Sequence, residues 1–271
     1  MSEATPIVIS GATGRMGRAL IRLATTLPDV QVAGALEAPG HDQIGEDSGS
    51  LAGEAANGIL VSADPTAALT ANRVLIEFSW PEPSLDHLRV AADQGCPVVL
   101  GTTGFDTAQQ EELDSIATRI PLLQATNMSV GVTLLTEVVE MVAGKLGAGF
   151  DMEVMETHHR LKKDAPSGTA LTLAAAAARG READLEDWGV YGRKGMVGER
   201  PDEEIGVMAL RGGDVVGDHT VFFFGTGERL ELTHKAGSRD AFASGALRAA
   251  HWLAGREPGA YRMQDVLGLQ L

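Results

Sequence analysis

The chain has a single cysteine, few aromatic residues and no long apolar run. The lone thiol, Cys96, excludes a disulfide within the chain and is compatible with a reducing compartment. Aromatic residues make up only 4% of the chain, so the core must consist mainly of Ala, Val, Leu and Ile, which is typical of parallel sheets covered by helices. No apolar run approaches the roughly 20 residues of a membrane span, and residues 1–6 lack the basic and apolar regions of a secretory leader. These absences predict a soluble, cytoplasmic protein.

Positive charge is also scarce, because 22 Lys and Arg residues face 37 Asp and Glu residues and give a formal net charge of −15. Such a chain repels phosphate backbones and anionic lipids, so we expect neither nucleic acid nor a membrane as partner. Apolar and small residues are abundant: 44% of the 271 residues are hydrophobic and 33 are glycine. This length and composition suffice for one large domain or two modest ones, each with its own core.

Short apolar runs alternate with helical patterns through the first half of the chain. The predicted strands are residues 6–10, 30–37, 73–79, 97–100 and 121–125, and the predicted helices are residues 15–27, 84–95 and 107–119. Repeated strand-helix units with right-handed crossovers predict an α/β domain with a Rossmann-like, doubly wound parallel sheet.

The pattern changes after a predicted helix at residues 132–146. Strands are expected at residues 151–157, 205–210, 215–224 and 229–234, with one helix around Ala170 and an exposed loop at residues 192–204. This predicts a central α+β domain with a mostly antiparallel or mixed sheet. The helix at residues 241–254 is expected to return to the first domain. The domains are therefore residues 1–128, completed by 239–271, and residues 129–238.

A glycine-rich turn, residues 11–17, follows the first predicted strand and opens the first predicted helix. Its Gly-x-x-Gly-x-x-Gly spacing permits a tight turn and the approach of a pyrophosphate to the helix start, although an ordinary glycine turn has the same composition. Glu37 strengthens the dinucleotide interpretation, because it ends the second strand about 20 residues later, where an acidic side chain binds the adenosine ribose. The small residues 101–104 follow another strand and suit a cofactor passing at the same edge.

The segment from Glu156 to Ala170 combines imidazoles, cations and a helix start. Asp164 or Ser167 is expected to cap a helix beginning near Pro166, so that the N–H groups of residues 167–169 face a negative group. The histidines and cations at residues 158–163 supply titratable protons and positive charge. A solvated strand-to-helix loop without chemistry is the alternative. The combination of the whole cluster with a helix start favours a site that binds a small carboxylate and protonates it.

These motifs, with residues 125–132 and 217–220, closely resemble the 4-hydroxy-tetrahydrodipicolinate reductases, also called dihydrodipicolinate reductases, of bacterial lysine and diaminopimelate synthesis. The likeness runs nearly from end to end, and its most specific part is the His-His-x-x-Lys-x-Asp-Ala-Pro-Ser-Gly-Thr-Ala motif that starts at His158. The resemblance implies a dinucleotide-binding domain and a central domain that binds substrate and assembles a homotetramer. It also implies the reduction of a cyclic dicarboxylate by NADH or NADPH.

The resemblance assigns roles to individual residues. It implies that His158 is the acid-base residue, that Lys162 donates a proton or stabilises charge, and that His159, Gly168 and Thr169 hold the substrate, to which the helix start adds Ser167. The implied cofactor-binding residues are Gly11, Ala12, Thr13, Gly14, Arg15, Met16, Glu37, Gly101, Thr102, Thr103, Ala125, Thr126, Asn127 and Met128.

Two positions depart from the family pattern. Ala38 stands where many relatives have an arginine that binds the 2′-phosphate of NADPH, so we expect NADH to be preferred, with Arg15 as the substitute partner for NADPH. Trp80 lies in a segment where a relative commonly has Thr and Arg, and we expect it to fill a surface hollow rather than stack on the cofactor.

Two other functions fit the same plan. The first is another two-domain nicotinamide-dependent dehydrogenase, of the aldehyde or homoserine type. The aldehyde type needs a thiolate, but Cys96 enters a strand at its amino end and is expected to be a buried structural thiol. The second is a dinucleotide-sensing regulator without catalysis. No metal site is expected, because His158 and His159 point to opposite faces of a strand. His219, His234 and Lys235 are expected to lie behind the site at most, and Arg239 to pair at a helix start or contact substrate.

Overall fold

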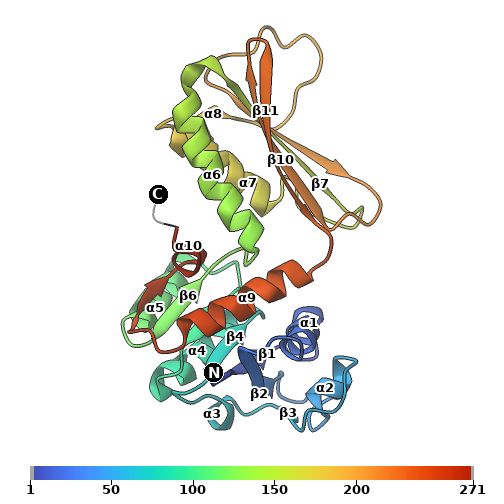
Figure 1. The fold of residues 1–271 in the computed structure, drawn as a ribbon, viewed down its shortest axis with the longest axis vertical. Coiled ribbons are helices and arrows are strands. Elements are labelled where there is room, and N and C mark those ends of the chain that lie inside the picture. The colour runs from blue at the N-terminus through green and yellow to red at the C-terminus, as the bar shows by residue number, and fades with distance from the viewer. Residues whose placement is uncertain (1–2, 270–271) are drawn as a thin grey trace. The chain divides into compact units, whose positions relative to one another are not determined.

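The computed structural model describes residues 3–269. These residues form two compact units, one that runs to Val130 and resumes at Arg239, and one that comprises Gly131–Ser238. Each unit is built on a single sheet (Figure 1).

The first unit contains a seven-stranded sheet in the order β12-β6-β5-β4-β1-β2-β3, and every neighbouring pair is parallel. Its strands are β1 (Thr5–Ser10), β2 (Val30–Leu36), β3 (Val61–Ser62), β4 (Val74–Glu77), β5 (Val98–Leu100), β6 (Pro121–Gln124) and β12 (Gly259–Tyr261). The chain moves from β1 outward through β2 and β3, then crosses to β4 on the other side. The doubly wound sheet is confirmed, and its strand order reverses between β1 and β4, where ligands bind in such sheets.

Both faces of this sheet are covered by helices. Ile7, Ile9 and Ile76 are buried on the face packed by α1 (Arg15–Ala24), α9 (Asp240–Leu253) and α10 (Met263–Leu267). Val8 and Leu75 alternate with them and are buried on the opposite face, which packs against α3 (Pro65–Ala68), α4 (Pro81–Gln94) and α5 (Thr107–Ala117). The short helix α2 (Ser48–Leu51) contributes Leu51 beside the first of these cores. The predicted return of the last long helix to the first unit is confirmed.

The second unit contains a mixed, five-stranded sheet in the order β11-β10-β7-β9-β8. Its strands are β7 (Asp151–His158), β8 (Gly189–Val190), β9 (Ile205–Arg211), β10 (Gly217–Gly225) and β11 (Glu228–Ala236). The pair β10 and β11 and the pair β10 and β7 are antiparallel, whereas β9 runs parallel to β7 and β8. The mixed sheet was one of the two predicted arrangements.

Two long helices, α6 (Val130–Leu146) and α7 (Gly168–Gly180), lie side by side against one face of this sheet (Figure 1). They approach closely because Gly144 and Gly180 lack side chains; a Cβ at Gly180 would lie 2.3 Å from the backbone oxygen of Glu140. The inward residues of β7 pack under the helices, and the outward ones, such as Met155, are exposed. The 3-10 turn η1 (Gly147–Gly149) follows α6, and the short helix α8 (Leu185–Trp188) follows α7.

The start of α7 differs from the sequence prediction. The helix begins at Gly168 rather than near Pro166, and its cap is Ser167, whose Oγ accepts a hydrogen bond from the Ala170 N–H at 3.2 Å. Asp164 pairs instead with Lys162.

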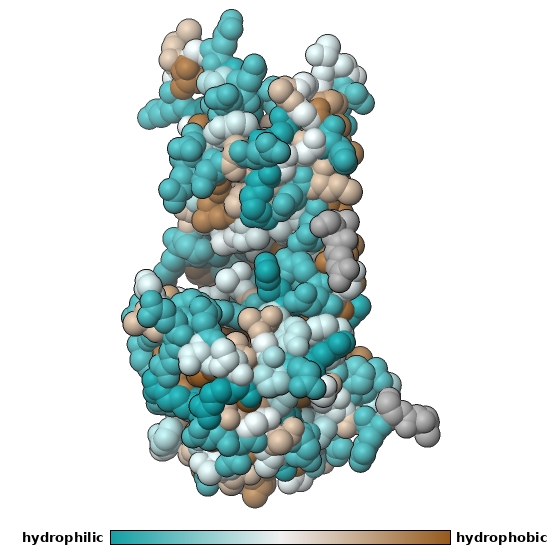
Figure 2. Space-filling model, turned by 90° about the vertical axis from the view of Figure 1, so that its left-hand side faces the viewer, coloured by the Kyte–Doolittle hydropathy of each residue, from teal (hydrophilic) through white to brown (hydrophobic). Residues whose placement is uncertain are grey.

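The face of the molecule drawn in Figure 2 has few exposed apolar side chains, as the strongly acidic composition suggests. Within residues 3–269, no helix is long and apolar enough to cross a membrane.

Candidate active site

The glycine turn after β1 is shaped for a close approach of the backbone. Gly11 has a φ of +63°, which favours glycine, and the Gly14 N–H donates to the Gly11 oxygen at 3.0 Å. A Cβ at Gly17 would lie 2.2 Å from that same oxygen, so only glycine lets α1 start this close to the turn. Gly14 caps α1 without a side-chain hydrogen bond. The amino end of α1 therefore suits a pyrophosphate.

Glu37 lies directly after β2 and beside this turn. Its Oε2 accepts hydrogen bonds from Thr13 Oγ1 at 2.6 Å and from the Thr13 N–H at 3.3 Å, and its Oε1 accepts from the Ala38 N–H at 3.0 Å. Burial tends to raise the pKa of Glu37, but these hydrogen bonds outweigh it and hold the pKa below the usual range. The carboxylate is therefore ionised and fixed where the second strand ends.

Two residues near Glu37 were missed by the sequence analysis. Arg18 donates from Nε to the Thr13 oxygen at 2.8 Å and from a second nitrogen to Gln43 at 3.3 Å, and His41 Nε2 lies 3.4 Å from Thr13 Oγ1. Arg18 brings positive charge to the turn, whereas only Arg15 was expected to do so. A basic residue one helical turn after Arg15 was the available signal, because residues three apart lie on the same helix face.

The residues after β5 form the next part of the same sheet edge. Gly101 is required there, because a Cβ would lie 2.1 Å from the Phe78 ring. Thr102 is buried, and its Oγ1 lies 2.8 Å from Ser84 Oγ and accepts from the Ser79 N–H at 3.1 Å. Thr103 beside it is exposed. Thr102 thus braces the edge, and Thr103 is accessible to a ligand.

The residues after β6 complete this edge. Thr126 is exposed, Ala125 and Asn127 are half-buried, and Met128 is buried beneath α9, where a Cβ at Gly245 would lie 1.8 Å from the Met128 oxygen. Trp80 is 76% exposed, so the expectation that it fills a surface hollow is wrong for this chain. The predicted cofactor residues therefore all follow the carboxyl ends of β1, β2, β5 and β6, on one edge of one sheet.

The catalytic candidate His158 ends β7 and is buried. Its Nδ1 lies 2.6 Å from Oε2 of Glu156, a fully buried carboxylate. Arg211, at the end of β9, donates to both oxygens of Glu156 at 2.7 and 2.8 Å. The roles of Glu156 and Arg211 were not predicted from the sequence. The signal for Glu156 was its spacing, because residues two apart in a strand share a face.

Ser167 connects this cluster to α7. Its N–H donates to Glu156 Oε1 at 3.0 Å, so the expectation that this N–H faces a ligand is wrong. Its Oγ lies 3.1 Å from Nε2 of His219, whose ring packs edge-on against His158 with the ring centres 5.1 Å apart. Gly168 is exposed, and a Cβ there would meet no atom within 4 Å. An anion can therefore approach the backbone at Gly168 and Thr169.

Lys162 lies in the loop between β7 and α7. Its Nζ is 2.8 Å from the carboxylate of Asp164, and this cation holds the pKa of Asp164 below its usual range. His159 is fixed by its backbone N–H, which donates to the Val215 oxygen at 2.7 Å, while its buried Nδ1 has no hydrogen-bond partner among residues 3–269. The loop thus holds a cation and an unsatisfied imidazole nitrogen beside the start of α7.

Cys96 is fully buried at the entrance to β5, and its thiol donates to the Arg73 oxygen at 3.3 Å. Burial raises the pKa of Cys96 to about 11. The expectation of a structural thiol is confirmed, and the thiolate of an aldehyde-type dehydrogenase has no counterpart in Cys96.

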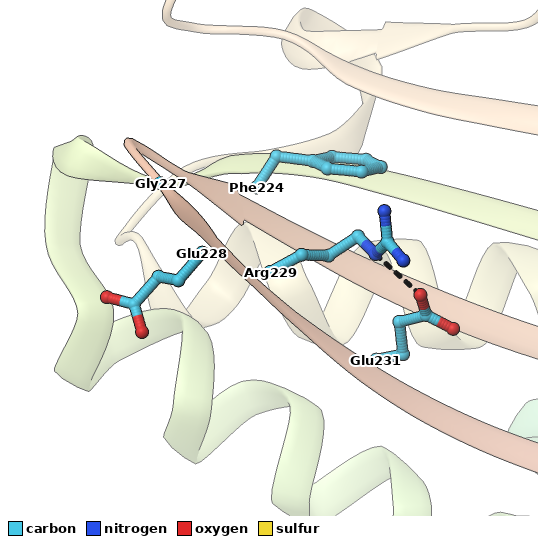
Figure 3. Close-up of a pocket in the computed structure, with 5 residues that line it drawn as sticks. All are labelled: Phe224, Gly227, Glu228, Arg229 and Glu231. Carbon is cyan, nitrogen blue, oxygen red and sulfur yellow. Dashed lines mark ion pairs between the residues drawn. The ribbon is translucent and has the colours of Figure 1, made fainter.

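A separate pocket lies at the β10–β11 hairpin. Arg229 and Glu231 form an ion pair of 2.6 Å in this pocket, which Phe224 also lines (Figure 3). Phe224 is seven residues along β10 from Gly217, which adjoins His158, a span of roughly 23 Å in an extended strand. This pocket therefore lies away from the histidine cluster and is not the candidate active site.

A Rossmann-like unit with a nucleotide-binding edge, joined to a mixed-sheet unit with a histidine and lysine cluster, defines the class of two-domain nicotinamide-dependent oxidoreductases. Two family profiles match the chain: "Dihydrodipicolinate reductase, N-terminus" over residues 5–128 and "Dihydrodipicolinate reductase, C-terminus" over residues 131–267. The chain belongs to the dihydrodipicolinate reductase family, which confirms the resemblance seen in the sequence.

Individual relatives agree with this assignment. The 4-hydroxy-tetrahydrodipicolinate reductase of Thiobacillus denitrificans is 50% identical over 97% of this chain and 98% of its own length. The enzyme of the same name from Magnetococcus marinus is 47% identical over the same shares. The solved structure of a dipicolinate-bound dihydrodipicolinate reductase from Paenisporosarcina sp. TG-14 has a TM-score of 0.75 at 20% identity, covering 97% of this chain and 98% of that one, and supports the fold.

Proposed function

We propose that the chain reduces 4-hydroxy-tetrahydrodipicolinate to tetrahydrodipicolinate with a reduced nicotinamide dinucleotide, a step of lysine and diaminopimelate synthesis. Relatives that carry this name match the chain almost from end to end. The observation that carries the proposal within the chain is the cluster of His158, Lys162 and the start of α7. It offers a proton, a cation and backbone donors to one small dicarboxylate.

The reaction consumes one hydride and one proton and releases one water. The coenzyme, when bound, supplies the hydride. Negative charge then develops on the substrate ring, and Lys162 stabilises it by its charge while His158 exchanges the proton through Nε2. The two substrate carboxylates fit the backbone N–H groups of Gly168 and Thr169 and the imidazole of His159. Ser167 supports this group indirectly, because it caps α7.

The residues at the edge of the first sheet fit a dinucleotide. The turn at residues 11–16 would hold the pyrophosphate, and Glu37 the adenosine ribose. Residues 101–103 and 125–128 would lie along the nicotinamide half. The close approach enforced at Gly17 and Gly101, where a Cβ would overlap other atoms, supports this fit.

A steady-state assay with enzymatically generated hydroxytetrahydrodipicolinate tests the activity. Purified protein should oxidise NADH only when substrate is present. His158→Gln and Lys162→Ala should each lower kcat by about 10²- to 10⁴-fold, the usual contribution of a general acid or base. The absence of NADH oxidation by folded wild-type protein would exclude the function, and full turnover in both variants would exclude the mechanism.

We also propose that NADH is preferred over NADPH. The ionised Glu37 would repel a 2′-phosphate, Ala38 offers it no charge, and the Arg18 guanidinium is engaged with Thr13 and Gln43. The wild type should therefore have a higher kcat/KM with NADH. Ala38→Arg should reduce or reverse this preference, because an arginine can bind the phosphate through two hydrogen bonds. A wild-type preference for NADPH would contradict the role given to Glu37.

We infer, finally, that the outer face of the second sheet assembles a homotetramer. This face carries the exposed side chains of Met155, Leu210 and Phe224, and the helices α6 and α7 cover only the opposite face. An exposed apolar sheet face of this kind is typical of an interface between subunits. The cytoplasmic location stays a prediction from the sequence composition.

A further inference from the structure

Glu156 is a carboxylate in the interior of the second unit, with no exposed surface. It points inward from β7, on the same side as Val154, which belongs to the core under α6 and α7. Burying an ionised carboxylate is costly unless charge and hydrogen bonds compensate. Its partners therefore indicate what the residue does.

Three structural elements supply those partners. From β9, Arg211 donates to both carboxylate oxygens at 2.7 and 2.8 Å, and from the start of α7 the Ser167 N–H donates to Oε1 at 3.0 Å. From β7 itself, His158 Nδ1 lies 2.6 Å from Oε2. Burial tends to raise the pKa of Glu156, but the bonds from Arg211, His158 and Ser167 outweigh it and hold the pKa below the usual range. Glu156 is ionised at neutral pH.

The geometry of β7 and β9 brings Glu156, His158 and Arg211 together. Glu156 and His158 are two residues apart in β7 and so share a face, and the parallel register places Arg211 beside His158. On the far side of the ring, a Cβ at Gly217 would lie 2.9 Å from His158 Nε2. The imidazole is thus held at Nδ1 by a carboxylate, and the glycine leaves room for Nε2.

An ionised carboxylate can only accept hydrogen bonds, so the proton of a neutral His158 must reside on Nδ1. We propose that Glu156 is the positioning residue of His158: it fixes the ring plane and the Nδ1–H tautomer, so that Nε2 exchanges the proton of the reaction. Arg211 keeps Glu156 ionised and also donates to the backbone carbonyl oxygen of Asp164 at 2.7 Å, which ties the loop that carries Lys162 to Glu156 and His158. This inference rests on the proposed function, which gives His158 its role.

The surrounding charges act on the same ring. His219 from β10 packs against it, and burial, followed by the nearby His158, lowers the pKa of His219 to about 4, so His219 is neutral at neutral pH. Lys162 and His234 also act electrostatically on His219. Glu156 is therefore the anion in direct contact with His158, and Arg211, Lys162 and Asp164 are the other ionised groups of the cluster.

The tautomer can be measured directly. Protein labelled with ¹⁵N-histidine is examined by NMR at a pH where the ring is neutral, and His158 is assigned by comparison with His158→Gln. We expect wild-type His158 to carry its proton on Nδ1. Finding the proton on Nε2 in the wild type would overturn the proposal, and no variant of Glu156 is needed for this test. The result also does not depend on the reductase assay.

Variants connect the tautomer to turnover. In Glu156→Gln the amide can donate or accept, so we expect both tautomers of His158 and a kcat about 100-fold lower, with KM changed much less. Arg211→Lys, which keeps a cation but loses the paired donors, should retain the Nδ1 proton and lose less activity. Glu140→Gln is the matched control, because it removes a carboxylate that accepts from Arg179 at 2.7 Å on the helices.

The outcomes separate the two proposals. An unchanged tautomer in Glu156→Gln, or a changed tautomer with unchanged kcat, would overturn the positioning role while wild-type activity upholds the proposed function. If the wild type is inactive, the function fails, and the NMR result still decides whether Glu156 sets the tautomer. If Glu156→Gln does not fold, the wild-type spectrum and Arg211→Lys decide.

Discussion

At the scale of single residues, the second unit places its ionisable groups in contrasting surroundings. Glu156 is buried but ionised, because Arg211 and the Ser167 N–H compensate its burial. His219 is buried without such compensation, and within the described part of the chain its Nδ1 has no hydrogen-bond partner. One group therefore stays charged and the other stays neutral, which is how neighbouring residues take different acid-base roles.

His219 should make stability depend on pH. Its folded pKa of about 4 lies below the unfolded value of about 6.5, so the unfolded chain binds the proton more tightly. The free energy of unfolding therefore has its full value above about pH 6.5 and decreases as the pH falls towards 4. The decrease due to His219 is at most about 3 kcal/mol. Urea unfolding between pH 4.5 and 7.5 measures it. His219→Gln should flatten the profile, and equal slopes in both proteins would contradict this account.

Residue pairs close in sequence could be predicted, and distant pairs could not. Glu37 was identified from its spacing to the glycine turn, and His158 and Lys162 from one motif. Arg211 lies 55 residues from Glu156, and only the parallel register of β7 and β9 brings them together. The contact between Glu156 and the Ser167 N–H was also missed, although the two residues are only 11 apart, because the path of the loop between β7 and α7 decides it.

At the scale of helices and strands, the long elements were predicted within a few residues, because their apolar periodicity is strong. The elements missed were short: β3 and β8 have two residues each, β12 has three, α2, α3 and α8 have four, and α10 has five. Segments of this length span little more than one period of a strand or helix pattern, so the pattern does not repeat and tertiary pairing decides their conformation. The start of α7 was misplaced by two residues, because Ser167 and Asp164 are both good helix caps.

Gly17 tests the link between an element and the cofactor. In Gly17→Ala the new Cβ would lie 2.2 Å from the Gly11 oxygen, so α1 or the turn must move. We expect the Kd for NADH, measured by fluorescence titration, to rise at least about tenfold, since the pyrophosphate needs this close packing. Gly149→Ala is the control, because a Cβ there would meet no atom within 4 Å. An unchanged Kd for Gly17→Ala would place the dinucleotide elsewhere.

At the scale of the whole molecule, the chain combines two units with different sheets, and each carries one part of the proposed site. The parallel sheet collects the proposed cofactor residues at the carboxyl ends of its strands, and the mixed sheet presents a proton and a cation beside α7. Fold class and family were evident from the sequence, because strand alternation and a long motif are local features. Assembly depends on a surface, which a sequence pattern describes poorly.

Sedimentation velocity tests the assembly. We expect one species with about four times the mass of a single chain. Leu210→Asp should shift it to smaller species, because the side chain is exposed on the outer sheet face proposed as the interface. Leu134→Asp, which changes an equally exposed leucine on α6, should not. A monomeric wild type would contradict the tetramer.

The central claim is that a small dicarboxylate binds at the amino end of α7, next to His158 and Lys162. A crystal structure with NADH and pyridine-2,6-dicarboxylate tests it most directly. We expect one carboxylate within hydrogen-bond distance of the Gly168 and Thr169 N–H groups, and the ring facing His158 and Lys162. A dicarboxylate bound at another place, with these groups facing only solvent, would contradict it.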